Sequence, residues 1–348
     1  MIKLIKPEFI AGSEKRFFDF IGKLNDEKTV IISHTDLDGV ASAKVVNKVV
    51  DADSVIFADY SDLNEEFAIK LKEEGFSKII ITDLNIDNIE FLKKLEFFSD
   101  ILLIDHHNFI KDFNSNKTVF LNAKGFCAAY LSYYLFSKIE DIEKLDWLIA
   151  CASISDWQYF ENFEWMKKVF SKYGDTFEIK DDRIRKNGLF WDLQLKLSLA
   201  IIYWREANNL LKVFDSIGAE FADIGGLNLH AEEVQKEIDL SLKKFEKEKK
   251  EFNGRFFWEF EGKYPLSSIV CTILSEKYLD KTLIVGREKK EYFNFSARRQ
   301  DGGERVDILL KKLVEGLEGA EAGGHTSAAG GFVLMKDKEN FIKLLKVL

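Results

Sequence analysis

The chain has 348 residues, of which 46% are hydrophobic and 31% are charged. This length favours two domains, and the composition is typical of a globular protein with a sizeable core, not of a disordered chain. The net charge of −9 and the pI near 5.3 argue against a protein that coats long nucleic acid by neutralising its phosphates, but they do not exclude an enzyme that cleaves phosphates.

The first part of the chain alternates short apolar runs with amphipathic segments. The apolar runs lack the two-residue alternation of half-exposed strands, which indicates buried strands at residues 29–33, 55–58, 79–81 and 101–104. The segments between them have the apolar spacing of helices and lie at residues 40–50, 64–74 and 88–97. This alternation predicts an α/β domain whose parallel sheet is covered by helices on both faces.

Helical patterns dominate the middle of the chain. A further strand is predicted at residues 118–121, followed by helices near 126–136 and 141–153, an irregular helical region from 157 to 217, and a polar loop at 180–188. Residues 231–252 are charged and free of Gly and Pro, and their apolar positions recur at helical spacing. We interpret this segment as a helix that connects two domains; a solvated surface helix within one domain is the alternative.

The last part predicts a smaller α/β unit. Its strands are expected at residues 255–260, 282–285, 292–296 and 331–334, and its helices near 267–278, 306–315 and 338–346. We therefore expect a first domain at residues 1–228 with a helical extension at 157–228, a connecting helix at 229–252, and a second domain at 253–348.

Imidazole and carboxylate groups gather where three of the predicted strands end. The first set recurs at every second position, so that in an extended segment its side chains project to one side. The three sets are His34, Asp36 and Asp38; Asp83; and Asp105, His106 and His107. Ligands bind at the carboxyl ends of strands in open α/β sheets, so we expect these groups to meet in one crevice.

These residue types predict a metal site. Imidazole plus carboxylate suits a borderline-hard divalent cation, and two such cations can hold the attacking and leaving oxygens of a phosphoester. An Asp after a strand is often only a turn residue or a helix N-cap, which is the alternative for Asp83 alone. Asp156 follows an apolar helical run and could add a carboxylate, although by itself it also fits a helix-end residue.

A glycine-rich motif surrounds His325 near the end of the chain. Gly323 and Gly324 precede it, and the small residues that follow, up to Gly331, could begin a helix against a phosphate group. Upstream, Arg298 closes a predicted strand, and guanidinium is suited to bidentate phosphate recognition. Taken singly, the two motifs also fit a Gly-rich turn and a solvated basic pair.

In chain order these motifs resemble the DHH phosphoesterase superfamily. The resemblance rests on H-x-D-x-D-G from His34, a strand-terminal Asp, the run Asp-His-His, a later Asp, and a C-terminal S-x-R followed by G-G-H. It covers residues 28–157 and 253–334, and the second part is similar to the DHHA1 domain of RecJ-type single-strand exonucleases and of nanoRNases. Many members have a third glycine where this chain has Ala322.

The resemblance implies a catalytic first domain with two divalent metal ions, Mn²⁺ or alternatively Mg²⁺. One ion would be held by His34, Asp36 and Asp83, with Asp83 bridging to the second ion. The ligands of the second ion would be Asp38, Asp83, His106 and Asp156. By the same resemblance His107 would contact the scissile phosphate, and Asp105 would orient an imidazole.

The resemblance also implies a substrate site in the second domain and a reaction. Phosphates of the substrate would be bound by Arg298, Gly323, Gly324 and His325, with cleavage between the domains. The expected activity is hydrolysis of phosphodiester bonds in single-stranded DNA or RNA or in short oligonucleotides, as in RecJ-like or nanoRNase-like exonucleases. The alternatives are a nucleotide phosphatase of the pAp or cyclic-dinucleotide type and a non-catalytic replication scaffold; a pyrophosphatase fits less well, because its second domain lacks the G-G-H loop.

Location and partners are expectations of the same kind. No apolar run approaches the roughly 18 residues of a membrane span, and no signal-peptide pattern begins the chain, so we expect a cytoplasmic protein without a membrane partner. A protein partner in DNA replication or repair would fit the family. Cys127, Cys151 and Cys271 are widely separated, which favours buried reduced thiols over disulfides or a zinc site.

Overall fold

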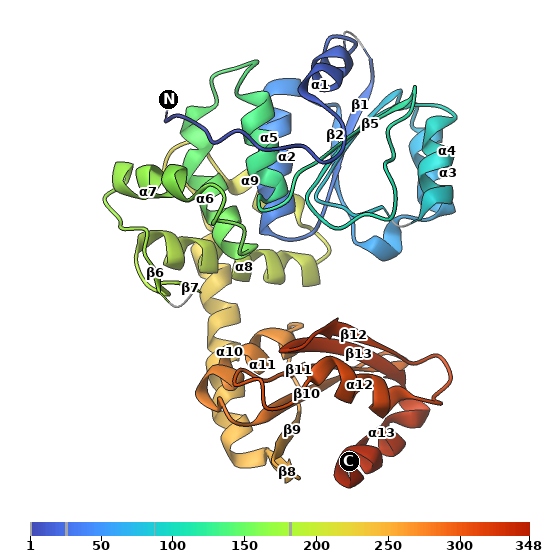
Figure 1. The fold of residues 1–348 in the computed structure, drawn as a ribbon, viewed down its shortest axis with the longest axis vertical. Coiled ribbons are helices and arrows are strands. Elements are labelled where there is room, and N and C mark those ends of the chain that lie inside the picture. Colours follow the sequence, from blue (N-terminus) through green and yellow to red (C-terminus); the bar gives the residue numbers. More distant parts are fainter. Residues whose placement is uncertain (1, 25–26, 87, 181–182) are drawn as a thin grey trace. The chain divides into compact units, whose positions relative to one another are not determined.

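A five-stranded parallel sheet organises the first of two units, residues 1–232 (Figure 1). The structure is a computed structural model and describes residues 2–24, 27–86, 88–180 and 183–348, so Asp181 and Asp182 of the predicted polar loop lie outside the described residues. The strand order is β2-β1-β3-β4-β5. The strands are β1 (Thr29–Ser33), β2 (Ser54–Phe57), β3 (Lys78–Thr82), β4 (Asp100–Asp105) and β5 (Thr118–Asn122). The predicted α/β fold is confirmed.

The register of this sheet aligns the carboxyl ends of three strands. Ser33 of β1 pairs with Thr82 of β3, and Thr82 pairs in turn with Ile104 of β4. The hydroxyls of Ser33 and Thr82 lie 2.7 Å apart, and Ser33 also donates to the carbonyl of Gly39 at 2.7 Å. The residues that follow β1, β3 and β4 therefore leave the sheet side by side.

Helices cover both faces of the sheet because its strands are apolar on both sides. Ile31 belongs to a large core cluster on one face with residues of α2 and α5, whereas Val30 and Ile32 belong to a second cluster with residues of α3 and α4 (Figure 1). The helices of this unit are α1 (Glu14–Ile21), α2 (Leu37–Val50), α3 (Glu65–Glu73), α4 (Ile89–Glu96), α5 (Ala128–Phe136), α6 (Asp146–Ser155), α7 (Phe163–Lys172), α8 (Leu189–Glu206) and α9 (Leu211–Ser216). Short 3₁₀ turns lie at η1 (Tyr60–Asp62) and η2 (Glu143–Leu145).

The second unit, residues 233–348, contains a six-stranded mixed sheet in the order β12-β13-β11-β10-β9-β8. Its strands are β8 (Lys250–Phe252), β9 (Arg255–Glu259), β10 (Thr282–Lys289), β11 (Tyr292–Arg298), β12 (Glu321–His325) and β13 (Ala328–Leu334). Its remaining elements are α11 (Ser267–Lys277), α12 (Val306–Val314), η3 (Met335–Asp337) and α13 (Lys338–Val347). Helix α10 (Leu227–Glu248) spans the boundary of the two units in the sequence.

Three segments outside the glycine-rich motif differ from the sequence-based prediction. The predicted helix at 231–252 ends at Glu248, because Asn253 and Gly254 take positive φ angles of 49° and 78° and close a hairpin between β8 and β9. The predicted loop at 180–188 contains a short pairing of β6 (Ile179–Lys180) with β7 (Arg183–Ile184). Helix α1 was not predicted.

Two further expectations concern membranes and cysteines. Among the described residues, no helix combines the length and the apolar character that crossing a bilayer requires. All three cysteines are buried free thiols, as predicted.

An ion pair links the start of β9 to the loop before α12 in the second unit. Arg255 donates three hydrogen bonds of 2.6 to 3.1 Å to Glu304, and the Thr282 hydroxyl donates a fourth at 2.6 Å. Burial opposes ionisation of Glu304, but Arg255 and Thr282 outweigh burial and lower the pKa of this carboxyl.

Replacing Glu304 with Gln should destabilise β9 and β10 by about 2 kcal/mol at pH 7, because charge-assisted hydrogen bonds are lost while Arg255 stays largely buried. A lowered folded-state pKa means that the contribution is complete above the unfolded value near 4.5 and is lost as the pH falls through the folded value. The difference in the stability of β9 and β10 between the variant and the wild type should therefore shrink towards pH 3.5. Native-state amide hydrogen exchange of both strands measures it, with the exposed Glu318→Gln as control; a difference independent of pH contradicts this account.

Candidate metal centre

His34, directly after β1, faces two carboxylates. Its Nδ1 lies 2.9 Å from Oδ2 of Asp36 and 3.5 Å from Oδ2 of Asp83, the residue that follows β3. Asp36 is also the N-cap of α2 and accepts the N–H of Gly39 at 2.9 Å. The start of α2 thus fixes one side of the site.

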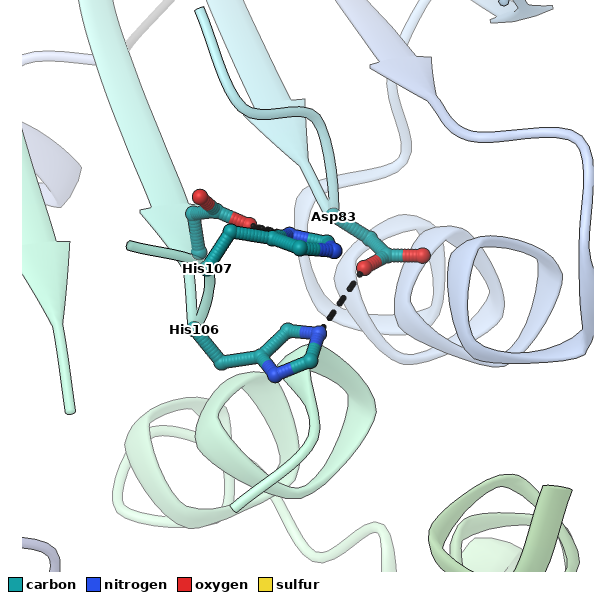
Figure 2. A group of neighbouring side chains, drawn as sticks. Asp83, His106 and His107 are labelled. Atoms are coloured by element: carbon teal, nitrogen blue, oxygen red, sulfur yellow. Dashed lines mark hydrogen bonds and ion pairs between the residues drawn. The ribbon is translucent and has the colours of Figure 1, made fainter. Parts of the chain in front are cut away.

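His106, directly after β4, faces three carboxylates. Its Nε2 lies 3.4 Å from Oδ1 of Asp83 (Figure 2), 3.4 Å from Oδ2 of Asp156 and 3.7 Å from Oδ2 of Asp38. Asp156 is the C-cap residue that directly follows α6. Asp83 is therefore near both histidines, and it lies between the two groups.

Asp83 has an unusual backbone conformation. Its φ is +58°, in the left-handed region that Asp and Asn tolerate better than other non-glycine residues, and its side chain is almost fully buried. The sharp turn directly after β3 directs the carboxylate between the histidines, as Figure 2 shows for His106.

Asp38 is anchored by the start of another helix. Its two carboxylate oxygens accept the backbone N–H groups of Ala128 and Ala129, each at 2.8 Å, in the first turn of α5. These N–H groups have no partner inside the helix, and the positive end of the helix dipole favours a carboxylate there.

His107 points its Nδ1 at Asp105, 2.8 Å away, and its backbone carbonyl accepts a hydrogen bond from Asn122 at 3.0 Å. Burial opposes protonation of His107, but the hydrogen bond and the charge of Asp105 outweigh burial and raise the pKa of the imidazole to about 9. Its ring centroid lies 4.3 Å from that of His106. Asp105 therefore favours the protonated form of His107, beside the carboxylate cluster.

The ionised forms of Asp83 and Asp156 are unfavourable in the protein without a bound cation. Burial, followed by the negative charge of Asp36, raises the pKa of Asp83 to about 8. Burial and the charge of Asp38 raise the pKa of Asp156 to about 9. For His34, burial lowers the pKa, but the carboxylates of Asp36 and Asp83 outweigh it and raise the value to about 10. Buried like charges need a counter-charge.

Unpartnered atoms mark where such a cation would fit. Among the described residues, the buried atoms His34 Nδ1, Asp83 Oδ2, His106 Nε2 and Asp156 Oδ2 lie 2.9 to 3.5 Å from an oppositely charged group of the cluster but make no well-aligned hydrogen bond. Three groups of these side chains bring one ligand atom each within 4.8 Å of one another: His34, Asp36 and Asp83; Asp38, His106 and Asp156; and Asp83, Asp105, His106 and His107. The donor set suits divalent cations such as Mn²⁺ or Mg²⁺. The structure therefore brings the eight predicted residues of the first unit together, and their individual roles stay predictions.

Asp59 was missed in the sequence. It follows β2, its Oδ1 lies 3.7 Å from Nε2 of His34, and it accepts the Thr35 hydroxyl at 2.7 Å. Arg205 lies 3.4 Å from its other oxygen. The signal was similar to the one used for Asp83, since Asp59 directly follows the apolar run at residues 55–58 that the sequence predicts as a strand.

The glycine motif of the second unit forms a hairpin. We expected its small residues to begin a helix, and this expectation is wrong: residues 321–325 and 328–334 are the antiparallel strands β12 and β13. Gly324 has a φ of +136°, and a Cβ there would lie 2.6 Å from the carbonyl oxygen of Ala328, so close strand pairing explains this glycine.

Arg298 and His325 both pair with Ala328, one from each neighbouring strand. Nη1 of Arg298 donates to the carbonyls of Ala297 and Ala329, and Nη2 donates to the Ser268 hydroxyl at 3.0 Å. Gly323 and His325 are exposed. The predicted substrate residues of this unit are thus neighbours across one sheet, and their role stays a prediction.

Comparison with known proteins finds a family model that matches one segment of the first unit. Residues 28–154 match the family described as "DHH family, N-terminal domain". RecJ from Thermus thermophilus, solved in complex with Mn²⁺, is similar over all of this chain, with a TM-score of 0.69 and 14% identity; the chain spans 55% of that protein. No curated protein sequence matches the chain.

Two other solved structures are similar. A pGpG-specific phosphodiesterase from Vibrio cholerae has a TM-score of 0.52 and 15% identity, with 92% of this chain and 98% of that chain covered. CDC45 from Entamoeba histolytica has a TM-score of 0.59 and 10% identity, with 96% and 98% covered. At these identities the likeness shows the fold alone.

Replacing Asp83 with Asn should weaken Mn²⁺ binding at least about 100-fold, because the shared carboxylate is lost while Asn still tolerates the left-handed backbone. Equilibrium dialysis or the electron paramagnetic resonance signal of free Mn²⁺ measures the change. The exposed Asp192→Asn serves as the matched control. Unchanged binding in the Asp83 variant would remove it from the ligand set.

The variants Asp38→Asn and Asp36→Asn should differ in stability. Asp38→Asn turns an amide donor towards the N–H of Ala128 or Ala129 and leaves a buried donor unpaired, so the free energy of unfolding should fall by about 1–3 kcal/mol. Asp36→Asn keeps a good N-cap residue and should change the free energy of unfolding by only about a few tenths of a kcal/mol. Both variants should lose divalent-metal affinity. Urea denaturation of the metal-free variants tests the contrast, and equal stability of the two refutes it.

Proposed function

We propose that this chain, whose residues 28–154 match the model "DHH family, N-terminal domain", is a divalent-metal-dependent phosphodiesterase of single-stranded nucleic acid or short oligonucleotides. The observation that carries the proposal is the meeting of unpartnered imidazole and carboxylate atoms at the carboxyl ends of β1, β3 and β4. Solved relatives support it, since one is a RecJ bound to Mn²⁺ and another is a pGpG-specific phosphodiesterase.

Two cations, Mn²⁺ or Mg²⁺, would be held by the two predicted ligand sets. One set is His34, Asp36 and Asp83, and the other is Asp38, Asp83, His106 and Asp156. When bound, such ions polarise the phosphate and lower the pKa of an attacking water towards ~7. In our proposal the chain itself supplies the buried, preorganised carboxylates that make this possible without a separate strong base.

His107 would bind the scissile phosphate. Its Nδ1–H is directed at Asp105, so Nε2–H is left to donate to an equatorial phosphate oxygen, and the charge on the ring offsets the charge that develops there. Asp105 is then a positioning residue that keeps the ring charged and oriented. Arg298, Gly323, Gly324 and His325 would hold further phosphates of the substrate.

Short substrates suit this chain better than long strands. Its net charge of −9 disfavours the extensive phosphate neutralisation that long single strands require. The likeness to a pGpG-specific phosphodiesterase points in the same direction. A non-catalytic scaffold stays the second candidate, because CDC45 shares the fold. Retention of all the predicted ligand types favours the enzyme.

Cleavage of end-labelled DNA and RNA of about 2 to 20 nucleotides in the presence of Mn²⁺ tests the proposal. Rapid loss of dimers with long strands left intact is the expected result. Ladders from long strands would instead indicate a RecJ-like exonuclease. A protein that binds Mn²⁺ but cleaves none of these substrates, or that binds no metal, would overturn the proposed activity and favour the scaffold.

Replacing His107 with Gln should lower kcat about 100-fold or more, as the loss of one donor to a developing oxyanion does. Mn²⁺ affinity should change by no more than about threefold, because the ring is directed at Asp105 and lies outside both predicted ligand sets. Steady-state kinetics on a dinucleotide, together with Mn²⁺ titration, separates the two effects. A variant that loses metal with activity would place His107 among the ligands instead.

A further inference from the structure

β2 is the outermost strand of the first sheet, and one of its edges has no strand partner among the described residues. The N–H of Ala58, directly after β2, donates to the carbonyl of Ser33 at 2.9 Å. Because backbone groups alternate in direction along a strand, the N–H and C=O groups of Val55 and Phe57 then point away from β1. These outward groups are a template for another strand.

A groove runs along this free edge. One part has a volume of about 470 Å³ and is lined by β2, by Thr35 and Asp59 beside His34, by Asp62, Lys70 and Glu74, and by Arg205 and residues 208–211. The other part has a volume of about 520 Å³ and is lined by β2 and α3. Both parts share Ile56, Phe57, Asp62 and Lys70, so they form one hollow, which we call the edge groove.

The two sides of the edge groove are both partly apolar. Val55 and Phe57 pack against the cluster formed with α2 and α5, whereas Ile56 packs against the cluster formed with α3 and α4. Ile69 of α3 is 49% exposed, and Leu211 of α9 is 43% exposed. A strand added to β2 would direct alternate side chains to these two sides.

The net charge of the edge groove is negative and therefore favours a positively charged ligand. Its carboxylates outnumber its cations; they are Asp59, Asp62, Glu66, Glu73 and Glu74. The two cations already face carboxylates, since Lys70 lies 3.9 Å from Glu74 and Arg205 lies 3.4 Å from Asp59. A single-stranded nucleic acid would be repelled, whereas a basic chain would be attracted.

We propose that the edge groove binds an extended segment of another protein, with alternating apolar and basic side chains, as an added strand beside β2. Backbone hydrogen bonds to Val55 and Phe57 would supply the pairing, and Glu66 and Glu73 on α3 would select the basic side chains. The docking proposal does not rest on the proposed phosphodiesterase activity, although Asp59 both lines the edge groove and lies 3.7 Å from Nε2 of His34.

Binding of a synthetic peptide tests the proposal directly. The probe is acetyl-Lys-Val-Lys-Val-Lys-Val-amide, titrated into the full chain by calorimetry, and the matched peptide has Glu in place of Lys. We expect saturable binding of the basic peptide, binding of the acidic peptide at least about tenfold weaker, and slower hydrogen exchange of the Val55 and Phe57 amides on addition of the basic peptide.

Substitutions in the groove locate the binding. Combining Glu66→Gln with Glu73→Gln should weaken binding of the basic peptide about three- to tenfold. Val55→Pro should abolish binding, because it removes an outward N–H that β1 does not use. Glu90→Gln, on the exposed face of α4, should change nothing.

Three results would overturn the proposal. They are no saturable binding of the basic peptide up to about 1 mM, equal binding of the acidic peptide, and binding unaffected by both the Glu66/Glu73 and Val55 changes. A concentration-dependent dimer that Val55→Pro abolishes would assign the edge to a second copy of this chain instead. None of these readouts uses phosphodiesterase activity, so failure here leaves that proposal intact.

Discussion

The pairing of β1, β3 and β4 in one register is the interaction on which the metal centre depends. Ser33, Thr82 and Ile104 lie abreast, so the chain leaves the sheet at three adjacent points within one edge. Each exit carries a ligand-type side chain within a few residues. Apolar packing on both faces holds this register, because shifting a buried strand by one residue would exchange the side chains of its two faces.

The same arrangement has an electrostatic cost. It gathers carboxylates in a buried place, and only some of them receive compensation from the protein. Asp36 is offset by His34 and the N–H of Gly39, and Asp38 accepts two N–H groups of α5. Asp83 and Asp156 each keep an unpartnered oxygen. A cation bound only by the folded state would therefore stabilise the fold as well as the reaction.

Much of the fold and of the site could be predicted from the sequence because parallel strands have a simple signature. Uninterrupted apolar runs gave β1, β3 and β4, and residues at their carboxyl ends were expected to meet. Longer-range or turn-driven features were harder. The hairpin turn at Asn253 and Gly254 requires α10 to end earlier than predicted. The small residues around Gly324 pair as strands and do not form a helix. Asp59, which lies two residues beyond β2, was not among the predicted site residues.

The shared carboxyl-end edge of β1, β3 and β4 limits where the chain can gain or lose residues during evolution. Gain or loss of one residue within β1, β3 or β4 would move a ligand-type side chain off the shared edge, so lengths there are fixed. The segment between β4 and β5, residues 106–117, carries His106 and His107 at its start and no other member of the cluster. Insertions beyond His107 are therefore where length variation among related chains should accumulate.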